Sequence, residues 1–164
     1  MFLKYAAMAC VLFCAPAAIA CSLKSGVQPF LPQGHVSSDV SAGLKAPLVE
    51  VLSITRGIGS RHSSCDDMGL LTLKLEWPRG TDYKLREIGF EFRVVSGEDS
   101  YQIFPAGPVS TKAEGRDSEY LFMWRDGPRA EQRAVQLEVE VRAVAPDNRR
   151  GPATRVTISS VPGT

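Results

Sequence analysis

The clearest structural signal in the chain is the run Val135-Gln136-Leu137-Glu138-Val139-Glu140-Val141-Arg142-Ala143, which alternates apolar and polar residues without interruption. Successive side chains of a β-strand point to opposite faces, so the run predicts a strand with one buried and one solvated face. Burial of a single face is typical of antiparallel sheets.

The same period of two recurs along most of the remaining chain. The other alternating segments are 48–54, 71–77, 88–94, 120–124 and 155–158, and 101–104 is a candidate short edge strand. Turn formers such as Arg125-Asp126-Gly127-Pro128 separate them, and no segment has convincing helical spacing. The pattern predicts an all-β fold: a single antiparallel two-sheet sandwich of about seven strands. Trp77 and Trp124 each close an alternating run and are expected in its core.

Composition and charge set limits on function. A length of 164 residues suggests one domain, and 44% hydrophobic with 23% charged residues supports a packed core. Lysine plus arginine total 19, against 18 for aspartate plus glutamate. Because this balance produces no net field that would attract a polyanionic duplex, nucleic acid is not expected as a partner.

Residues 1–20 have the layout of a cleavable signal peptide. Lys4 precedes an apolar run over residues 5–14, Pro16 interrupts it, and Ala18-Ile19-Ala20 has the small-x-small form that a signal peptidase accepts. The run is too short to cross a bilayer as a stable helix. The less favoured alternative is a buried N-terminal helix. The sequence thus predicts an exported protein, periplasmic or secreted.

Cys21, the residue after the expected cleavage point, has two competing interpretations. Cys10 and Cys14 leave with the signal, so Cys21 and Cys65 form an even pair that favours a disulfide in an oxidising compartment. The segment up to Cys21 also resembles a bacterial lipobox, although Ala18 stands where leucine is usual. Lipidation of Cys21 would then anchor the protein to a membrane. The two interpretations stay open, with a slight preference for the disulfide.

The expected mature chain divides into three parts. Residues 21–46 are rich in proline, glycine and serine and predict an extended arm. Phe30 and Leu31 are its bulky side chains and are candidates for docking onto the domain. Residues 47–161 form the sandwich, and residues 162–164 are a tail.

Three segments resemble the fibronectin type III family of immunoglobulin-like sandwiches. Leu73-Lys74-Leu75-Glu76-Trp77-Pro78 is similar to that family's second strand, and Phe90-Glu91-Phe92-Arg93 stands where its third strand would be. Residues 139–144 and 153–159 resemble its closing hairpin. The resemblance covers residues 46–161, but Leu137 occupies the position of a usual tyrosine. It implies a role in binding, spacing or adhesion rather than catalysis.

The long loop after the first strand is the stretch with the most varied set of potentially reactive or metal-binding side chains. His62, Cys65, Asp66 and Asp67 are possible metal ligands, but a zinc site needs about four ligands at defined spacing, and the only other histidine is His35. A solvated loop tethered by Cys65 is the favoured interpretation. A Ser-His-Asp or Cys-His arrangement is conceivable from Ser63, His62, Cys65 and Asp67. Neighbours in one loop rarely give the geometry of a catalytic triad, however, and no catalytic motif is present. We therefore expect no enzyme activity, no metal and no cofactor; a small exported hydrolase or metal-binding protein is the weakest alternative.

The loops 78–87 and 145–152 are expected at the same pole of the sandwich. They carry the candidate binding residues Arg79, Tyr83, Lys84, Arg86, Arg149 and Arg150. Loops on a rigid scaffold are frequent binding sites, and these are basic although Asp82, Glu87 and Asp147 offset part of the charge. An envelope protein, a polysaccharide or a membrane surface would each suit this chemistry. The sequence thus favours an exported, non-enzymatic module that binds or acts as a structural spacer in the cell envelope, with a lipoprotein lipidated at Cys21 as the alternative.

Intact mass of the mature protein, with and without reduction, separates the two fates of Cys21. For a Cys21–Cys65 disulfide, we expect a chain starting at Cys21 that takes up two alkyl groups only after reduction. A mass raised by a diacylglycerol and an acyl chain, with Cys65 alkylated without reduction, would contradict the disulfide.

Overall fold

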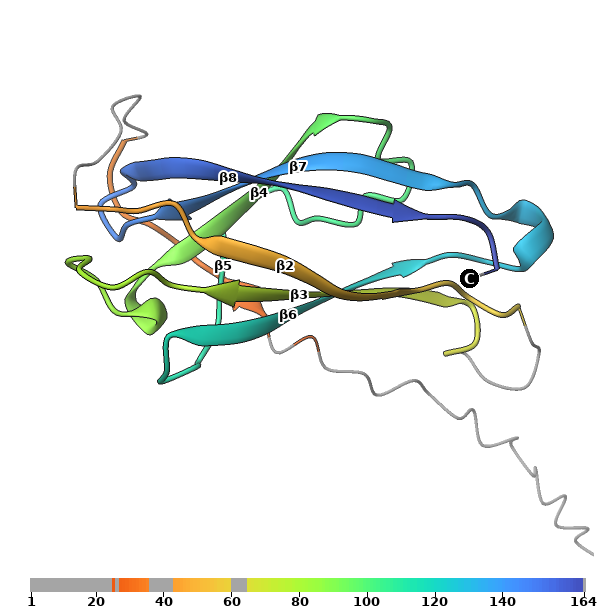
Figure 1. Cartoon of the computed structure of the whole chain (residues 1–164), viewed down its shortest axis with the longest axis horizontal. Helices are drawn as coiled ribbons and strands as arrows, with labels where there is room; N and C mark the ends of the chain where they lie inside the picture. The colour runs from red at the N-terminus through yellow and green to blue at the C-terminus, as the bar shows by residue number, and fades with distance from the viewer. Residues whose placement is uncertain (1–24, 26, 36–42, 60–64, 164) are drawn as a thin grey trace, which may run out of the picture.

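The computed structural model describes residues 25, 27–35, 43–59 and 65–163, which form two antiparallel β-sheets packed face to face (Figure 1). The all-β, two-sheet architecture expected from the alternating runs is confirmed. The helical elements among the described residues are two single 3-10 turns, η1 (Leu85–Glu87) and η2 (Arg129–Glu131). No helix of the described residues is long and apolar enough to cross a membrane.

The larger sheet has five strands in the order β1-β5-β4-β7-β8. Their bounds are β1 (Gln28–Pro29), β5 (Val109–Ser110), β4 (Gly89–Ser96), β7 (Val135–Val144) and β8 (Arg150–Ser160). The smaller sheet has the order β2-β3-β6, with β2 (Leu48–Thr55), β3 (Met68–Glu76) and β6 (Asp117–Arg125). Every strand pair is antiparallel, as one-face burial requires.

One detail of the sequence interpretation is wrong. Residues 101–104 form no strand, because Ile103 and Phe104 turn into the core instead, and the short edge strand is β5 further along the chain. Within the expected arm, Gln28 and Pro29 pair with Ser110 and Val109 as the short strand β1, which the sequence pattern does not reveal. Proline is tolerated there because an edge strand can do without a donor.

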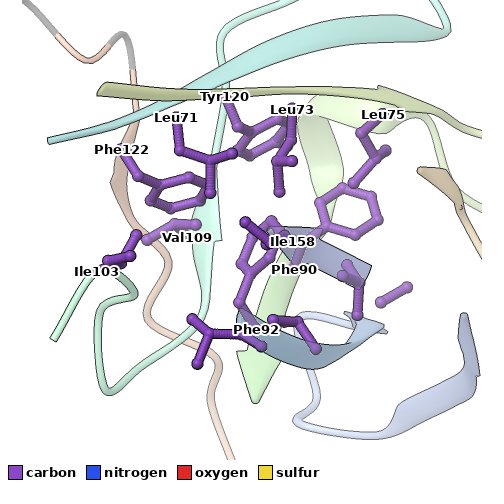
Figure 2. Close-up of a cluster of buried hydrophobic side chains, with 14 of the residues drawn as sticks. Leu71, Leu73, Leu75, Phe90, Phe92, Ile103, Val109, Tyr120, Phe122 and Ile158 are labelled. Carbon is purple, nitrogen blue, oxygen red and sulfur yellow. The ribbon is translucent and has the colours of Figure 1, made fainter. Parts of the chain in front are cut away.

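The core lies between the inner faces of the two sheets (Figure 2). Leu71, Leu73 and Leu75 of β3 are completely buried, which is the outcome of their alternate spacing. Phe90 of β4 meets Tyr120 of β6 edge-on, with ring centroids 6.0 Å apart. Further aromatic contacts across the core involve Trp77, Phe92, Phe104 and Phe122. Edge-to-face aromatic pairs add roughly 0.5–1.5 kcal/mol each beyond the burial of their area.

Trp77 and Trp124 are both core residues, as predicted, with 2% and 3% of their surface exposed. The indole Nε1 of Trp77 donates to the carbonyl oxygen of Tyr83 at 2.9 Å. Gly69 pairs with Trp124 across β3 and β6, and a Cβ at this glycine would overlap the indole ring. The missing side chain at Gly69 therefore lets Trp124 lie flat across β3.

The arm docks along one edge of the larger sheet. Phe30 packs directly against Gly89, where a Cβ would overlap the phenyl ring, whereas Leu31 is 85% exposed. The Gln33 amide donates to the carbonyl of Pro146, and Asn148 Nδ2 donates to the carbonyl of Gly34. Of the two bulky arm residues, only Phe30 docks, and residues 33–34 of the arm contact the loop between β7 and β8.

A buried ion pair closes the opposite pole. Arg56 and Asp126 are joined at 2.7 Å and both side chains are inaccessible to solvent. Arg56 Nη2 also donates to the hydroxyl of Tyr101 and the carbonyl of Arg133. Burial alone would raise the pKa of Asp126, but the hydrogen bonds from Arg56 and the Gly57 amide outweigh it and lower that pKa. The pair and its hydrogen bonds thus join the chain segments that follow β2, β4 and β6, which are far apart in the sequence.

Truncating an inner-face leucine tests the packing of the core. Leu73→Ala is expected to lower the free energy of unfolding by about 2–5 kcal/mol, because it removes buried methyl groups and leaves a cavity. Leu52→Ala is the matched control, since Leu52 lies on β2 with 43% of its surface exposed. Urea unfolding at neutral pH measures both; equal losses in the two variants would contradict the described core.

Candidate functional site: a cationic surface

The connection between β3 and β4 is held in one conformation by its own hydrogen bonds. The carbonyl of Tyr83 accepts from Trp77 Nε1 at 2.9 Å and from Thr81 Oγ1 at 3.0 Å. Leu85 of η1 is buried, and the carboxylate of Glu87 caps this turn by accepting from the Lys84 amide. The charged side chains of this loop therefore project from a fixed backbone.

The loops 78–87 and 145–149 meet at one pole, as the sequence indicated. Arg149 Nη2 donates to the hydroxyl of Tyr83 at 3.2 Å, and Arg149 Nε pairs with Asp147 at 2.7 Å. That pair, through its hydrogen bond and its Coulomb attraction, raises the pKa of Arg149. Asn148 adopts a left-handed backbone conformation that makes the turn tight. Tyr83 and Arg149 are thus brought together from two loops.

Several cations at this pole have no acidic partner. Arg79, Lys84 and Arg86 are exposed and form no ion pair with any other described residue. Lys45, which sequence reasoning missed, joins them by donating to the carbonyl of Arg79 at 2.7 Å. The basic pole is defined here as Lys45, Arg79, Lys84, Arg86 and Arg149.

Unlike the other candidate binding residues, Arg150 is mostly buried and pairs with a residue of the larger sheet. Its Nε donates to Glu91 on β4 at 2.9 Å, and its Nη1 donates to the carbonyl of Asn148 at 3.0 Å. Only 19% of its side chain is exposed. Arg150 therefore connects the basic pole to the outer face of the larger sheet.

That outer face holds a cluster of guanidinium groups. The carboxylate of Glu140 accepts from Arg93 at 2.8 Å, from Arg142 at 3.1 Å and from Arg155 at 3.1 Å. Strand register explains the cluster, because Glu140 of β7 pairs with Arg93 of β4 on one side and Arg155 of β8 on the other. The hydrogen bonds from Arg93, Arg142 and Arg155 lower the pKa of Glu140 to about 2.

Positive charge is in excess on this face. Arg93, Arg142, Arg150 and Arg155 stand against Glu91, Glu138 and Glu140. A depression of about 250 Å³ lies among them, lined by Glu91, Arg93, Glu140, Arg142 and Arg150. Same-face residues of a strand repeat every 6.6–6.8 Å or so, which spaces the guanidinium groups along the sheet. The arginine cluster, defined as Arg93, Arg142, Arg150 and Arg155, continues the basic pole into one cationic surface.

Sequence reasoning missed the arginine cluster although its residues are visible in the sequence. The outward positions of the alternating runs carry Glu91, Arg93, Glu138, Glu140 and Arg142. From the sequence alone, these positions predict only a solvated face. Opposite charges on neighbouring strands were the available signal, but pairing them requires the strand register.

The described part of the chemically varied loop between β2 and β3, residues 56–59 and 65–67, shows no comparable site. Within the described ranges, no group of three or more His, Cys, Asp and Glu side chains is placed to hold a metal. His62 and Ser63 lie outside the described residues. The backbone carbonyls of Asp66 and Asp67 accept hydrogen bonds from Ile58 and Asp126, so this part of the loop is tied to the pole with the buried ion pair.

Of the residues expected to be cleaved, lipidated or cross-linked, the structure describes Cys65 alone. Cys65 is half-buried at the end of the loop between β2 and β3. Cys21 and the expected signal peptide, residues 1–20, lie outside the described residues. The Cys21–Cys65 pairing and the lipidation of Cys21 therefore both stay predictions.

Comparison with known proteins supplies no relative, since no family model and no curated protein matches the chain. The function is therefore inferred from the chemistry of the cationic surface.

Replacing Glu140 tests how the arginine cluster is held. A carboxylate with a lowered pKa stabilises the fold above its ordinary pKa of 4.5, and this contribution is lost as the pH falls toward 2. Glu140→Gln is thus expected to lower the urea midpoint at pH 7, and its difference from wild type should shrink at pH 3 and below.

Glu114→Gln provides the matched control for this titration. Glu114 is exposed and forms no ion pair with another described residue, so this variant should stay close to wild type at both pH values. A Glu140→Gln deficit that stays constant from pH 7 to pH 3 would contradict the described role of the carboxylate.

Proposed function

We propose that this protein is an exported, non-enzymatic β-sandwich module that binds an acidic polysaccharide of the cell envelope through its cationic surface. The observation that carries the proposal is the continuity of this surface. The exposed cations Arg79, Lys84 and Arg86 of the basic pole lead through Arg150 to the arginine cluster, on a backbone fixed by sheet pairing. Export follows from the signal-like layout of residues 1–20.

The sandwich is of the fibronectin type III kind in this proposal. Supporting features are the three-stranded sheet β2-β3-β6, the closing hairpin β7–β8, and the core position of Trp77 after β3. Leu137 is buried where that family usually has a tyrosine, and the core tyrosine of this chain is Tyr120 on β6. Such sandwiches commonly serve as binding or spacing modules.

The composition of the surface favours a sugar polymer over other anionic partners. Its guanidinium groups donate to carboxylate or sulfate, while Glu91 and Glu138 offer acceptors to hydroxyl groups. An acidic peptide has few hydroxyl donors that could meet these glutamate acceptors. The depression is lined by charged residues alone, so it offers no apolar pocket for a peptide side chain.

Charge neutralisation at the basic pole tests the proposal. Binding to immobilised dextran sulfate is expected for the wild type and not to neutral dextran. Arg79→Gln, Arg86→Gln and Arg149→Gln together should weaken binding about tenfold or more, since exposed ion pairs contribute roughly 0.2–1 kcal/mol each. Raising the ionic strength to about 1 M should abolish binding, because screening shortens the range of charge interactions.

A charge-matched control separates a site from net charge. Lys112, Arg129 and Arg133 are exposed outside the cationic surface, and replacing all three by glutamine removes the same charge. This variant should bind dextran sulfate within about twofold of wild type, consistent with surface pairs being local. Equal losses in both triple variants, or stronger binding to polyglutamate or anionic vesicles than to dextran sulfate, would count against a polysaccharide site.

A further inference from the structure

The free edge of β6 has a sequence that is complementary to itself. β6 is the outer strand of the sheet β2-β3-β6, and no other described strand pairs with its far edge. Its buried residues Tyr120, Phe122 and Trp124 alternate with an outward series of Glu119, Leu121, Met123 and Arg125. Long unpaired edges are templates for pairing with another chain unless a protein protects them.

An apolar groove runs beside this edge. It has a volume of about 320 Å³, and its lining includes Leu121, Phe122 and Met123 of β6, the core residues Ile103 and Val109, and arm residues such as Val27. Figure 1 shows β6 at the margin of the smaller sheet, with no labelled strand beyond it. The apolar lining means that an occupant here would remove hydrophobic surface from water.

We propose that two copies of this protein associate through antiparallel pairing of their β6 edges, which joins the two three-stranded sheets into one. A twofold axis through Phe122 places Glu119 of each copy opposite Arg125 of the other. The same axis places Leu121 opposite Met123. Both types of cross-strand pair are stabilising, and neither Glu119 nor Arg125 has an ion-pair partner among the described residues.

The charges select this occupant and this direction. Parallel pairing in register would set Glu119 beside Glu119 and Arg125 beside Arg125, and like charges directly opposite are destabilising. No other described strand pairs with the far edge of residues 119–125. At the start of β6, Thr111 Oγ1 lies 2.9 Å from Ser118 Oγ.

The association is expected to be weak and concentration-dependent. Seven paired residues and a small groove bury less surface than the roughly 1,200–2,000 Å² of a stable specific interface. The proposal is independent of polysaccharide binding, because Arg125 and Glu119 lie on the smaller sheet and outside the cationic surface. A dimer would nevertheless present two cationic surfaces to one polymer, which strengthens binding by avidity.

Sedimentation equilibrium of the purified protein is the first measurement. The average mass is expected to rise from one chain toward two between about 5 μM and about 500 μM, the range of a micromolar dissociation constant. A single-chain mass up to about 1 mM would overturn the proposal and leave the edge to a different partner.

Charge exchange across the axis identifies the surface and the register. Glu119→Arg and Arg125→Glu should each raise the dissociation constant at least about tenfold, because like charges then face each other twice. A one-to-one mixture of the two variants should restore the dimer, since each substituted position faces an opposite charge in the other chain. Circular dichroism and thermal unfolding confirm that both variants fold.

Asp117→Arg is the matched control, because Asp117 is exposed on the same strand but lies before the open edge. It should leave the dissociation constant within about twofold of wild type, as expected for a charge outside the interface. A dimer that persists in both single variants, or that fails to reform in their mixture, would overturn pairing through β6.

Discussion

Burial of one side-chain face from each sheet is the constraint on which the rest of this molecule depends. Leu71, Leu73 and Leu75 of β3 face Phe90 and Phe92 of β4, and each such side chain contributes roughly 1.5–3 kcal/mol when removed from water. A register slip of one residue would turn this whole set toward solvent. Burial of the inner faces therefore determines which residues point to solvent. Those residues form the cationic surface on the larger sheet and the exposed edge of β6 on the smaller sheet.

The two outer faces differ in chemistry and suit different partners. On the larger sheet, Glu140 accepts hydrogen bonds from three arginines and holds their guanidinium groups in a fixed array. Exposed charge pairs add little stability, so their value lies in holding donors ready for an anion. On the smaller sheet, Leu121 and Met123 stay half-buried beside an unpaired edge. In the proposals made above, the charged face binds a hydrated polymer, and the edge of the smaller sheet pairs with a second chain.

The two poles also divide their roles. Arg56 and Asp126 are desolvated together, and removing one partner of such a pair typically costs 3–5 kcal/mol because the other charge stays buried. That pole ties the connections from β2, from β4 and from β6 to one another. At the opposite pole the arm docks through backbone hydrogen bonds, while the cations remain exposed. Loops left in solvent on a rigid scaffold are available for recognition.

Alternation of apolar residues was enough to predict the all-β class, the two antiparallel sheets, and the core positions of Trp77 and Trp124, because a period of two has one structural meaning. The meeting of Tyr83 with Arg149 was also predictable, since the loops between neighbouring strands share a pole. Strand register could not be predicted from the sequence. The clustering of Arg93, Arg142 and Arg155 around Glu140 depends on that register, so it could not be predicted either. The strand in the arm and the Arg56–Asp126 pair were equally hidden, because they join residues 70 or more positions apart. Contacts of that kind follow from folding geometry in three dimensions, and no local pattern encodes them.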